Sequence, residues 1–267
     1  VIPIIHVLSV SFSMGNEAAQ MGLMLRPKGF TLDSYKFVFK GAALWRAYGV
    51  TIFITVVGTT LNLFLTTTAA YVLSRSDLPG RGVLTVFVVI TMVFNAGIIP
   101  GYMLIRNLGL LDSVWAMILP GAVSAFNLIL MRNFFEEIPT SIIESARMDG
   151  ASELRILGQV VLPVSGPAIA TIGLFYAVAH WNEFFRGIFY ITDPNKWPLQ
   201  VLLRSVVVMA DLNELGMSNR DLYGQLTVNQ LTIRAATVMA AVVPIATLYP
   251  FLQRYFVKGI VLGAEKG

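Results

Sequence analysis

Charged residues divide this chain into long apolar blocks separated by short polar segments. Asp, Glu, Lys and Arg are absent from five blocks, each close to or longer than the roughly 20 residues that a helix needs to cross a bilayer. Lipid offers the backbone no hydrogen-bond partners, so blocks of this kind are predicted to be helices. The blocks are 47–74, 82–105, 113–131, 156–182 and 235–253.

Together with the uncharged segment 1–13, these blocks predict an all-α membrane protein with six spans in a single domain covering 1–267. The first segment is short and has no basic stretch before it, so we interpret it as the end of a span and not as a signal peptide. Gly97 and Pro100 interrupt the third span, and lipid tolerates such breaks where neighbouring helices satisfy the backbone. The first span ends near residue 12, and the others are predicted at 44–74, 82–104, 114–134, 164–190 and 231–256.

The polar segments between the spans indicate the orientation of the chain. Lys and Arg concentrate in cytoplasmic loops, and they occur in the turn 75–81, in the segment 139–163 and in the C-terminal tail. Six spans put these three segments on one side, predicted to be the cytoplasm. The predicted outer loops are then about 13–41 and 192–230, and the second is too long for a simple turn. Its apolar run from residue 201 to 210 predicts an ordered outer element.

Composition excludes several other classes of protein. The chain is 56% hydrophobic and 13% charged, with a mean hydropathy of +0.72, whereas soluble domains carry about 25% charged residues. Cysteine is absent, which excludes disulfides and thiolate metal sites. The net charge of +4 is spread out, whereas nucleic-acid binding needs a clustered patch. The dipeptide Gly-Lys never occurs, so the chain lacks the phosphate loop through which many ATPases bind ATP.

The segment 139–163 is polar although it lies between two apolar blocks. Ser141 and Glu144 have the spacing of a capping box, which predicts that a short helix begins directly after Ser141. Gly150 is a natural helix stop, because glycine adopts the left-handed conformation that ends many helices. A second helical run is predicted from there toward Val161. The segment is therefore expected to form a helix, a sharp turn and a second helix.

These residues resemble the "EAA loop" of binding-protein-dependent ABC importer permeases. The resemblance implies a type I importer permease whose cytoplasmic coupling helix contacts a separate ATPase, and that ATPase would use ATP and Mg. It implies neither catalytic residues nor a metal or cofactor in this chain. Ser145 stands where the family usually has Ala, and it is small enough to keep the packing. The other matching residues are Glu144, Ala146, Asp149, Gly150, Ala151, Leu162, Pro163 and Pro167.

Further motifs resemble those of carbohydrate importers, in particular the smaller membrane subunit of the maltose importer and the lipo-oligosaccharide and alginate type. The motifs lie at 71–81, 108–113, 181–184 and 253–267. The resemblance implies that the chain forms half of a path for an oligosaccharide, with an acidic sugar such as alginate as one candidate. Implied partners are a homologous second permease, two ATPase subunits and an extracytoplasmic solute-binding protein, with no nucleic acid. The implied location is the bacterial cytoplasmic (inner) membrane, crossed several times.

The fifth predicted span supplies the candidate residues of the substrate path. Glu183 and Arg186 have helical spacing and are predicted to share one face, and ionisable groups in spans usually face protein or water. Asn182 adds hydrogen-bonding capacity, and Tyr176, Trp181 and Phe184 could stack on sugar rings. The alternative is an aromatic belt at the membrane interface with Glu183 and Arg186 as a structural pair.

Two other functions compete with the importer permease. A stand-alone secondary transporter often has inverted repeats and paired broken helices, but no internal repeat is evident, and the polar segment 139–163 would have no role. An intramembrane enzyme needs a nucleophile–base pair or metal ligands. The chain has only two histidines, no cysteine and no His-Glu-x-x-His motif, so the enzyme is the weaker alternative.

Overall fold

The computed structural model describes residues 2–19, 22–94, 96–208, 228–244 and 246–247. Helices dominate this part, where β-structure is limited to an isolated bridge between Ser13 and Phe30. The chain forms two compact units, which are described separately. Unit 1 comprises Val1–Ile52, Leu111–Val114 and Asn182–Pro250, and unit 2 comprises Phe53–Leu110, Trp115–Trp181 and Phe251–Gly267.

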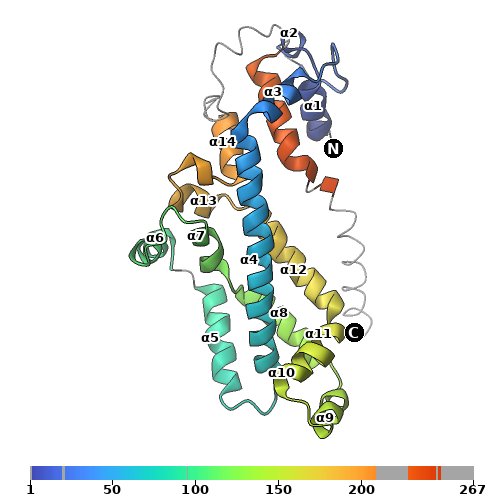
Figure 1. The fold of residues 1–267 in the computed structure, drawn as a ribbon, viewed down its shortest axis with the longest axis vertical. Coiled ribbons are helices and arrows are strands. Elements are labelled where there is room, and N and C mark those ends of the chain that lie inside the picture. Colours follow the sequence, from blue (N-terminus) through green and yellow to red (C-terminus); the bar gives the residue numbers. More distant parts are fainter. Residues whose placement is uncertain (1, 20–21, 95, 209–227, 245, 248–267) are drawn as a thin grey trace. The chain divides into compact units, whose positions relative to one another are not determined.

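Unit 1 consists mainly of short helices (Figure 1). Val10, Ala18, Met24 and Ala235 form one buried apolar cluster in it. The helices are α1 (Ile2–Ser11), α2 (Gly15–Ala18), α3 (Asp33–Lys40), the beginning of α4 (Ala42–Ser74), α13 (Phe185–Tyr190), the 3-10 turn η3 (Pro194–Lys196), α14 (Leu199–Val208) and the helix Gln230–Pro244.

Unit 2 contains the rest of α4 and the helices from α5 to α12. Its core joins four stretches of the chain through buried side chains such as Ala70, Met131, Ile156 and Ile172, each fully buried. The helices are α5 (Arg81–Val93), α6 (Ile98–Asn107), α7 (Trp115–Ile118), η1 (Leu119–Gly121), α8 (Ala125–Glu136), α9 (Thr140–Met148), α10 (Glu153–Ile156), the π-helical η2 (Leu157–Val161), α11 (Leu162–Val164) and α12 (Gly166–Trp181).

Helix α4 confirms the predicted span 44–74. It runs over 33 residues without proline, and three of its threonines satisfy their hydroxyls inside the helix. Thr60, Thr67 and Thr68 each donate to the carbonyl oxygen four residues earlier, at 2.7–2.8 Å. Such internal bonds allow threonine to lie in an apolar helix without an unsatisfied hydroxyl.

The third, fourth and fifth predicted spans are broken, and the count of six is not confirmed. Within the described part, α4 is the one helix that is long and apolar enough to cross a membrane. If each bent pair of helices counts as one span, the number rises to at most four. The third predicted span stops at Val93 and resumes at Ile98, with Gly97 at φ 86°. The fourth bends by 52° after the turn Leu119–Gly121, and the helices on either side of Ser165 meet at 86°.

The fifth span ends earlier than predicted, since α12 stops at Trp181 and α13 begins at Phe185. The last span is described as the helix Gln230–Pro244, and residues 248–256 of the prediction lie outside the described residues. The ordered element predicted in this segment is the helix α14 as far as Val208, and its place on the outer side stays a prediction. Residues 209 and 210 of that predicted run also lie outside the described residues.

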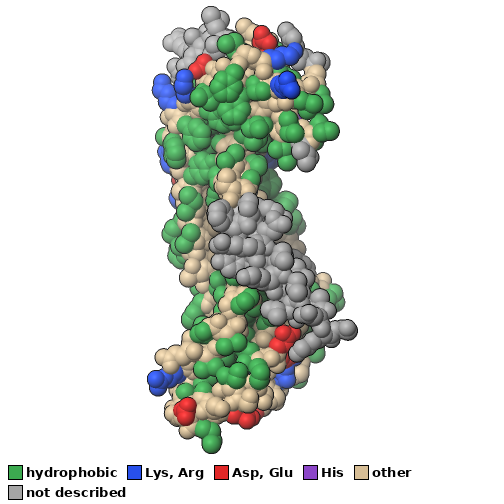
Figure 2. Space-filling model, turned by 90° about the vertical axis from the view of Figure 1, so that its right-hand side faces the viewer, with side chains coloured by type: hydrophobic (Ala, Val, Ile, Leu, Met, Phe, Trp, Pro, Cys, Tyr) green, Lys and Arg blue, Asp and Glu red, His purple; other side chains and the backbone are tan. Residues whose placement is uncertain are grey.

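Apolar side chains cover much of the described surface on the face drawn in Figure 2. In helix α5, none of the residues is buried. Val86 and Phe87 are 58% and 63% exposed. Exposed apolar faces of this size mark a membrane or a protein interface, as expected for a membrane-integral chain.

Gly58 in α4 provides a test of the packing between α4 and α12. A Cβ at Gly58 would lie 2.5 Å from Nε2 of the buried His180, and that nitrogen is 3.0 Å from the Asn62 amide. Gly58→Ala is expected to lower the unfolding midpoint in detergent, because overpacking costs about 1–3 kcal/mol. Gly49→Ala in the same helix is the control, since nothing lies within 4 Å of its Cβ. Equal midpoints for the two variants would contradict the packing argument.

Candidate functional site

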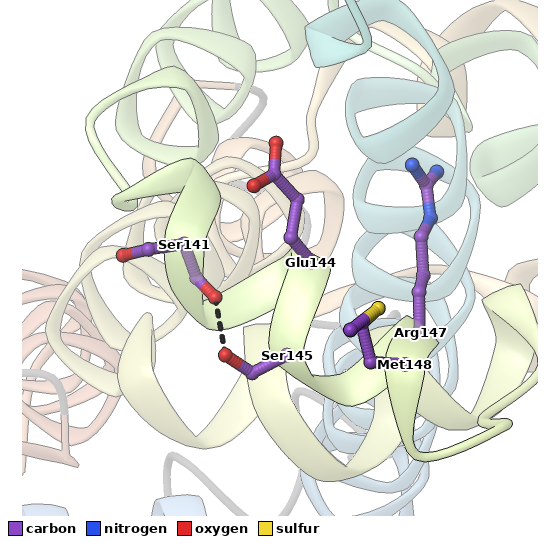
Figure 3. A pocket seen from close by; sticks show the side chains of 5 residues that line it. All are labelled: Ser141, Glu144, Ser145, Arg147 and Met148. Carbon is purple, nitrogen blue, oxygen red and sulfur yellow. Dashed lines mark hydrogen bonds between the residues drawn. The ribbon is translucent and has the colours of Figure 1, made fainter.

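Helix α9 begins at Thr140, and its start differs from the prediction. Pro139 is the N-cap residue, with φ −56° and ψ 127°, and no side chain caps the helix. Ser141 therefore lies inside the first turn, so the predicted capping box with Glu144 is wrong. The Ser141 carbonyl oxygen instead accepts a hydrogen bond from Ser145 Oγ at 2.8 Å (Figure 3). With Pro139 as the N-cap, the helix starts two positions too early for Ser141 to cap it.

The end of α9 follows the prediction. Gly150 has φ +77°, its N–H donates to the Arg147 carbonyl at 2.9 Å, and the Ala151 N–H donates to the Ala146 carbonyl at 3.0 Å. These two bonds define a Schellman motif, in which a left-handed residue closes the helix. The direction of the chain after α9 is therefore fixed by the backbone of one glycine.

One face of α9 is open to solvent. Ser141, Glu144, Ser145, Arg147 and Met148 line an open hollow on this helix (Figure 3). Met148 is 89% exposed, and within the described residues Glu144 has no ion-pair partner. An exposed thioether beside an unpaired carboxylate is suited to contact with another protein.

The opposite side of α9 packs against the core of unit 2, to which α9 belongs. Ile143, Ala146, Ala151 and Leu162 are partly buried against its core, and Pro163 lies in the one-turn helix α11. The motif residues therefore divide into two groups. Ala146, Ala151 and Leu162 hold the segment in place, and Glu144 and Ser145 face outward.

Glu153 connects this segment to the end of α4. Its Oε1 accepts from Arg147 Nη2 at 2.6 Å, and its Oε2 accepts from the Tyr71 hydroxyl at 2.5 Å and lies 3.5 Å from Arg75 Nη1. Arg75 also pairs with Asp77 at 3.2 Å. One carboxylate thus joins α9, α10 and α4, and sequence analysis gave no sign of it because Tyr71 lies 82 residues away.

A second carboxylate fixes the turn after α4. Glu136 at the end of α8 pairs with Arg81 and, at 2.8 Å, with Arg132. Arg81 Nε also donates to the Leu73 carbonyl at 2.9 Å. The turn 75–81 is therefore attached to α8 as well as to α4.

Two of the candidate substrate residues, Tyr176 and Trp181, belong to unit 2. Tyr176 is 4% exposed, and its hydroxyl contacts Thr66 Oγ1 at 2.8 Å and the Ser124 N–H at 3.0 Å. Its ring is thus enclosed in the core, so in this structure it offers no face for a sugar. Trp181 is half-buried at the end of α12.

The other three, Asn182, Glu183 and Arg186, belong to unit 1. Glu183 Oε2 lies 2.7 Å from Arg186 Nη1, which confirms the predicted pair. The predicted helical face is wrong, because Glu183 precedes α13 and its Oε1 accepts the Arg186 backbone N–H at 3.0 Å. A carboxylate at a helix N-terminus stabilises the exposed N–H groups. This geometry favours the structural reading of the pair.

Asp112 lies in the motif 108–113, but the sequence did not indicate its role, which is to organise part of unit 1. Its φ is +56°, and its carboxylate accepts from the Thr192 N–H at 2.6 Å, the Thr192 hydroxyl at 2.5 Å and the Asp193 N–H at 3.0 Å. Lys196 Nζ donates to the Asp112 carbonyl at 2.8 Å. These contacts form what we call the Asp112 clasp. A positive φ favours Asp or Asn, but partners 80 residues away cannot be read from the sequence.

The Asp112 clasp should depend on pH. Hydrogen bonds, first from the Thr192 hydroxyl and then from the backbone, hold the pKa of Asp112 below its ordinary value. The clasp is therefore present at neutral pH and lost as the pH falls through that lowered pKa. In Asp112→Asn, the Thr192 and Asp193 amides should exchange hydrogen several-fold faster at pH 7, and the difference from wild type should shrink at acidic pH.

Asp33→Asn is the matched control for hydrogen exchange, because Asp33 pairs with Lys36 on the surface of α3. Exchange at Thr192 and Asp193 should remain as in wild type in that variant. Equal protection of these two amides in wild type and Asp112→Asn at neutral pH would show that the clasp does not order the loop.

The family model described as "Binding-protein-dependent transport system inner membrane component" matches residues 45–261. The polygalacturonan/rhamnogalacturonan transport system permease protein YtcP of Bacillus subtilis (strain 168) is 44% identical over 272 residues, covering 100% of this chain and 93% of that protein. Protein LplC of the same organism is 44% identical over 267 residues, covering 100% and 90%.

A solved structure agrees with the sequence comparisons. It is the crystal structure of a bacterial ABC transporter involved in the import of the acidic polysaccharide alginate, and one of its chains superposes with a TM-score of 0.90 at 37% identity. The match covers 96% of this chain and 90% of that chain. The chain therefore belongs to the family of binding-protein-dependent transport system inner membrane components.

Proposed function

We propose that this chain is one of two homologous membrane subunits of an ABC importer for an oligosaccharide, and that it forms half of the translocation path. The family match over residues 45–261 carries this proposal. A stand-alone secondary transporter is not supported, because transport in this family depends on a binding protein. The full proposal includes six spans in the bacterial inner membrane.

The proposed substrate is an oligosaccharide rich in acidic sugars. YtcP is named for polygalacturonan and rhamnogalacturonan, and the solved neighbour is described as importing the acidic polysaccharide alginate. These polymers share uronic acid units, each with a carboxylate. A substrate of this kind carries several negative charges, so its path should offer cations and hydrogen-bond donors.

The proposed ATPase contact is the open face of α9 on the cytoplasmic side. Met148 and Glu144 would meet a groove of the ATPase, which binds and hydrolyses ATP with Mg. The Schellman motif at Gly150 and the Glu153 contacts would transmit movement of α9 to α4. On the outer side, we propose that the loop 192–230, ordered in part by the Asp112 clasp, receives the solute-binding protein.

Purification through a tag on this chain tests the assembly. We expect a homologous permease and an ATPase to accompany it in proportions of about one to one to two, identified by mass spectrometry, since obligate membrane subunits share large apolar interfaces. Uptake of oligogalacturonides into proteoliposomes would then need ATP and the binding protein. A chain that purifies alone and drives uptake with an ion gradient would refute the proposal.

A further inference from the structure

Helix α14 and the segment between α12 and α13 bring four polar or aromatic side chains together in unit 1. Gln200 Nε2 donates to Asn182 Oδ1 at 3.4 Å, and the Arg204 guanidinium carbon lies 5.8 Å from the centroid of the Phe184 ring. Gln200 and Arg204 are four residues apart on α14, so they share one helix face. We call Asn182, Phe184, Gln200 and Arg204 the α14 cluster.

The charge of Arg204 distinguishes this cluster from the neighbouring ion pair. Arg186 is neutralised by Glu183 at 2.7 Å. Arg204 is half-buried, and within the residues that the structure describes no carboxylate lies within ion-pair distance of it. Removing a cation partly from water without a counter-charge costs free energy. An anionic ligand would supply that counter-charge.

Phe184 prepares Arg204 for such a ligand. A guanidinium over an aromatic ring is stabilised by the cation–π interaction, and the ring restricts the orientation of the guanidinium plane. The N–H groups at the edge of that plane then remain available for a carboxylate, which arginine binds through two parallel hydrogen bonds. The amides of Asn182 and Gln200 can donate to and accept from hydroxyls, as a sugar ring requires.

We propose that the α14 cluster is a binding site for a uronate unit, with Arg204 on the sugar carboxylate and Asn182 and Gln200 on its hydroxyls. This inference rests on the proposed oligosaccharide import and assigns the selection of acidic sugars to Arg204. A neutral sugar would need the amides and the aromatic ring but no cation. The resemblance of residues 181–184 to carbohydrate importers did not include Gln200 or Arg204, which the fold adds from a separate helix.

The test uses the complete importer, purified with its own partner subunits but without the binding protein. Its ligands are trigalacturonate and the methyl ester of trigalacturonate, which keep the same hydroxyls and differ in charge. Wild type should bind the acid at least about tenfold more tightly than the ester, as a charge-assisted bidentate contact provides. Arg204→Gln should bring the two affinities close to each other, and Arg204→Lys should give an intermediate ratio.

Lys36→Gln is the control, since Lys36 lies on the surface of α3 with 75% of its side chain exposed, and it should keep the wild-type ratio. The unfolding midpoint of each variant shows whether it is folded. If Arg204→Gln is unstable, the acid-to-ester ratio of Arg204→Lys decides the test. An unchanged acid-to-ester ratio in Arg204→Gln would overturn the assignment of Arg204 while oligosaccharide import stands. Failure of the wild-type importer to take up any oligogalacturonide, with its binding protein and ATP supplied, would refute the proposed substrate and this inference together.

Discussion

Gly150→Pro is expected to reduce uptake by at least about tenfold and to abolish the stimulation of ATP hydrolysis by loaded binding protein, since proline fixes φ near −65° and removes a backbone donor. Gly150 has φ +77°, and its N–H bonds to the Arg147 carbonyl at 2.9 Å. Proline can satisfy neither condition, so the Schellman motif should open and α9 should lose its fixed direction. Both activities are measured on the reconstituted importer.

Gly150→Asn separates the backbone requirement from the loss of glycine itself. Asparagine adopts the left-handed conformation more readily than most residues, and nothing lies within 4 Å of a Cβ at this position. This variant should retain most of the uptake, whereas deletion of residues 144–150 should eliminate it. Normal uptake and normal stimulated hydrolysis in the proline variant would refute the coupling role of α9.

The features that could be predicted from the sequence are those determined by neighbouring residues. The exclusion of charge over 47–74 predicted α4 to within a few residues, because a long apolar helix needs no information from elsewhere in the chain. The end of α9 at Gly150 was predicted for the same reason, because the left-handed residue that ends a helix is usually glycine. The predicted capping box was wrong, because Pro139 and not Ser141 is the N-cap residue of α9.

Features that depend on distant residues could not be predicted. Proline and glycine indicated a break in the third span, and Pro120 and Gly121 mark the bend in the fourth in the same way, although the sequence analysis did not use them. Asp112 lies in the motif 108–113, but its contacts, like those of Arg204, could not be predicted because the partners come from other elements. Tyr176 looked like a sugar platform in the sequence, and the fold engages its hydroxyl with Thr66 in the core.

Glu153→Gln is expected to weaken the coupling of ATP hydrolysis to uptake without abolishing it. Glutamine keeps an acceptor for Tyr71 but loses the charge that Arg147 and Arg75 share, so these two cations are left without a common counter-ion. The Glu153 side chain is 53% exposed, and exposed pairs contribute about 1 kcal/mol or less each. The ATP consumed per sugar imported should therefore rise by about two- to fivefold.

Asp77→Asn is the matched control for Glu153→Gln, because Asp77 also pairs with Arg75, whereas Glu153 is the partner of Arg147 in α9. It should leave the ratio of ATP to sugar unchanged. A charge swap, Glu153→Arg with Arg147→Glu, restores one attraction and should recover part of the coupling that each single change loses. If Glu153 acted only on stability, Glu153→Arg and Arg147→Glu would each lower the unfolding midpoint and leave the ratio of ATP to sugar unchanged. The charge swap would then restore the midpoint only. A change in the ratio at an unchanged midpoint is the result that assigns Glu153 to the link between α9 and α4.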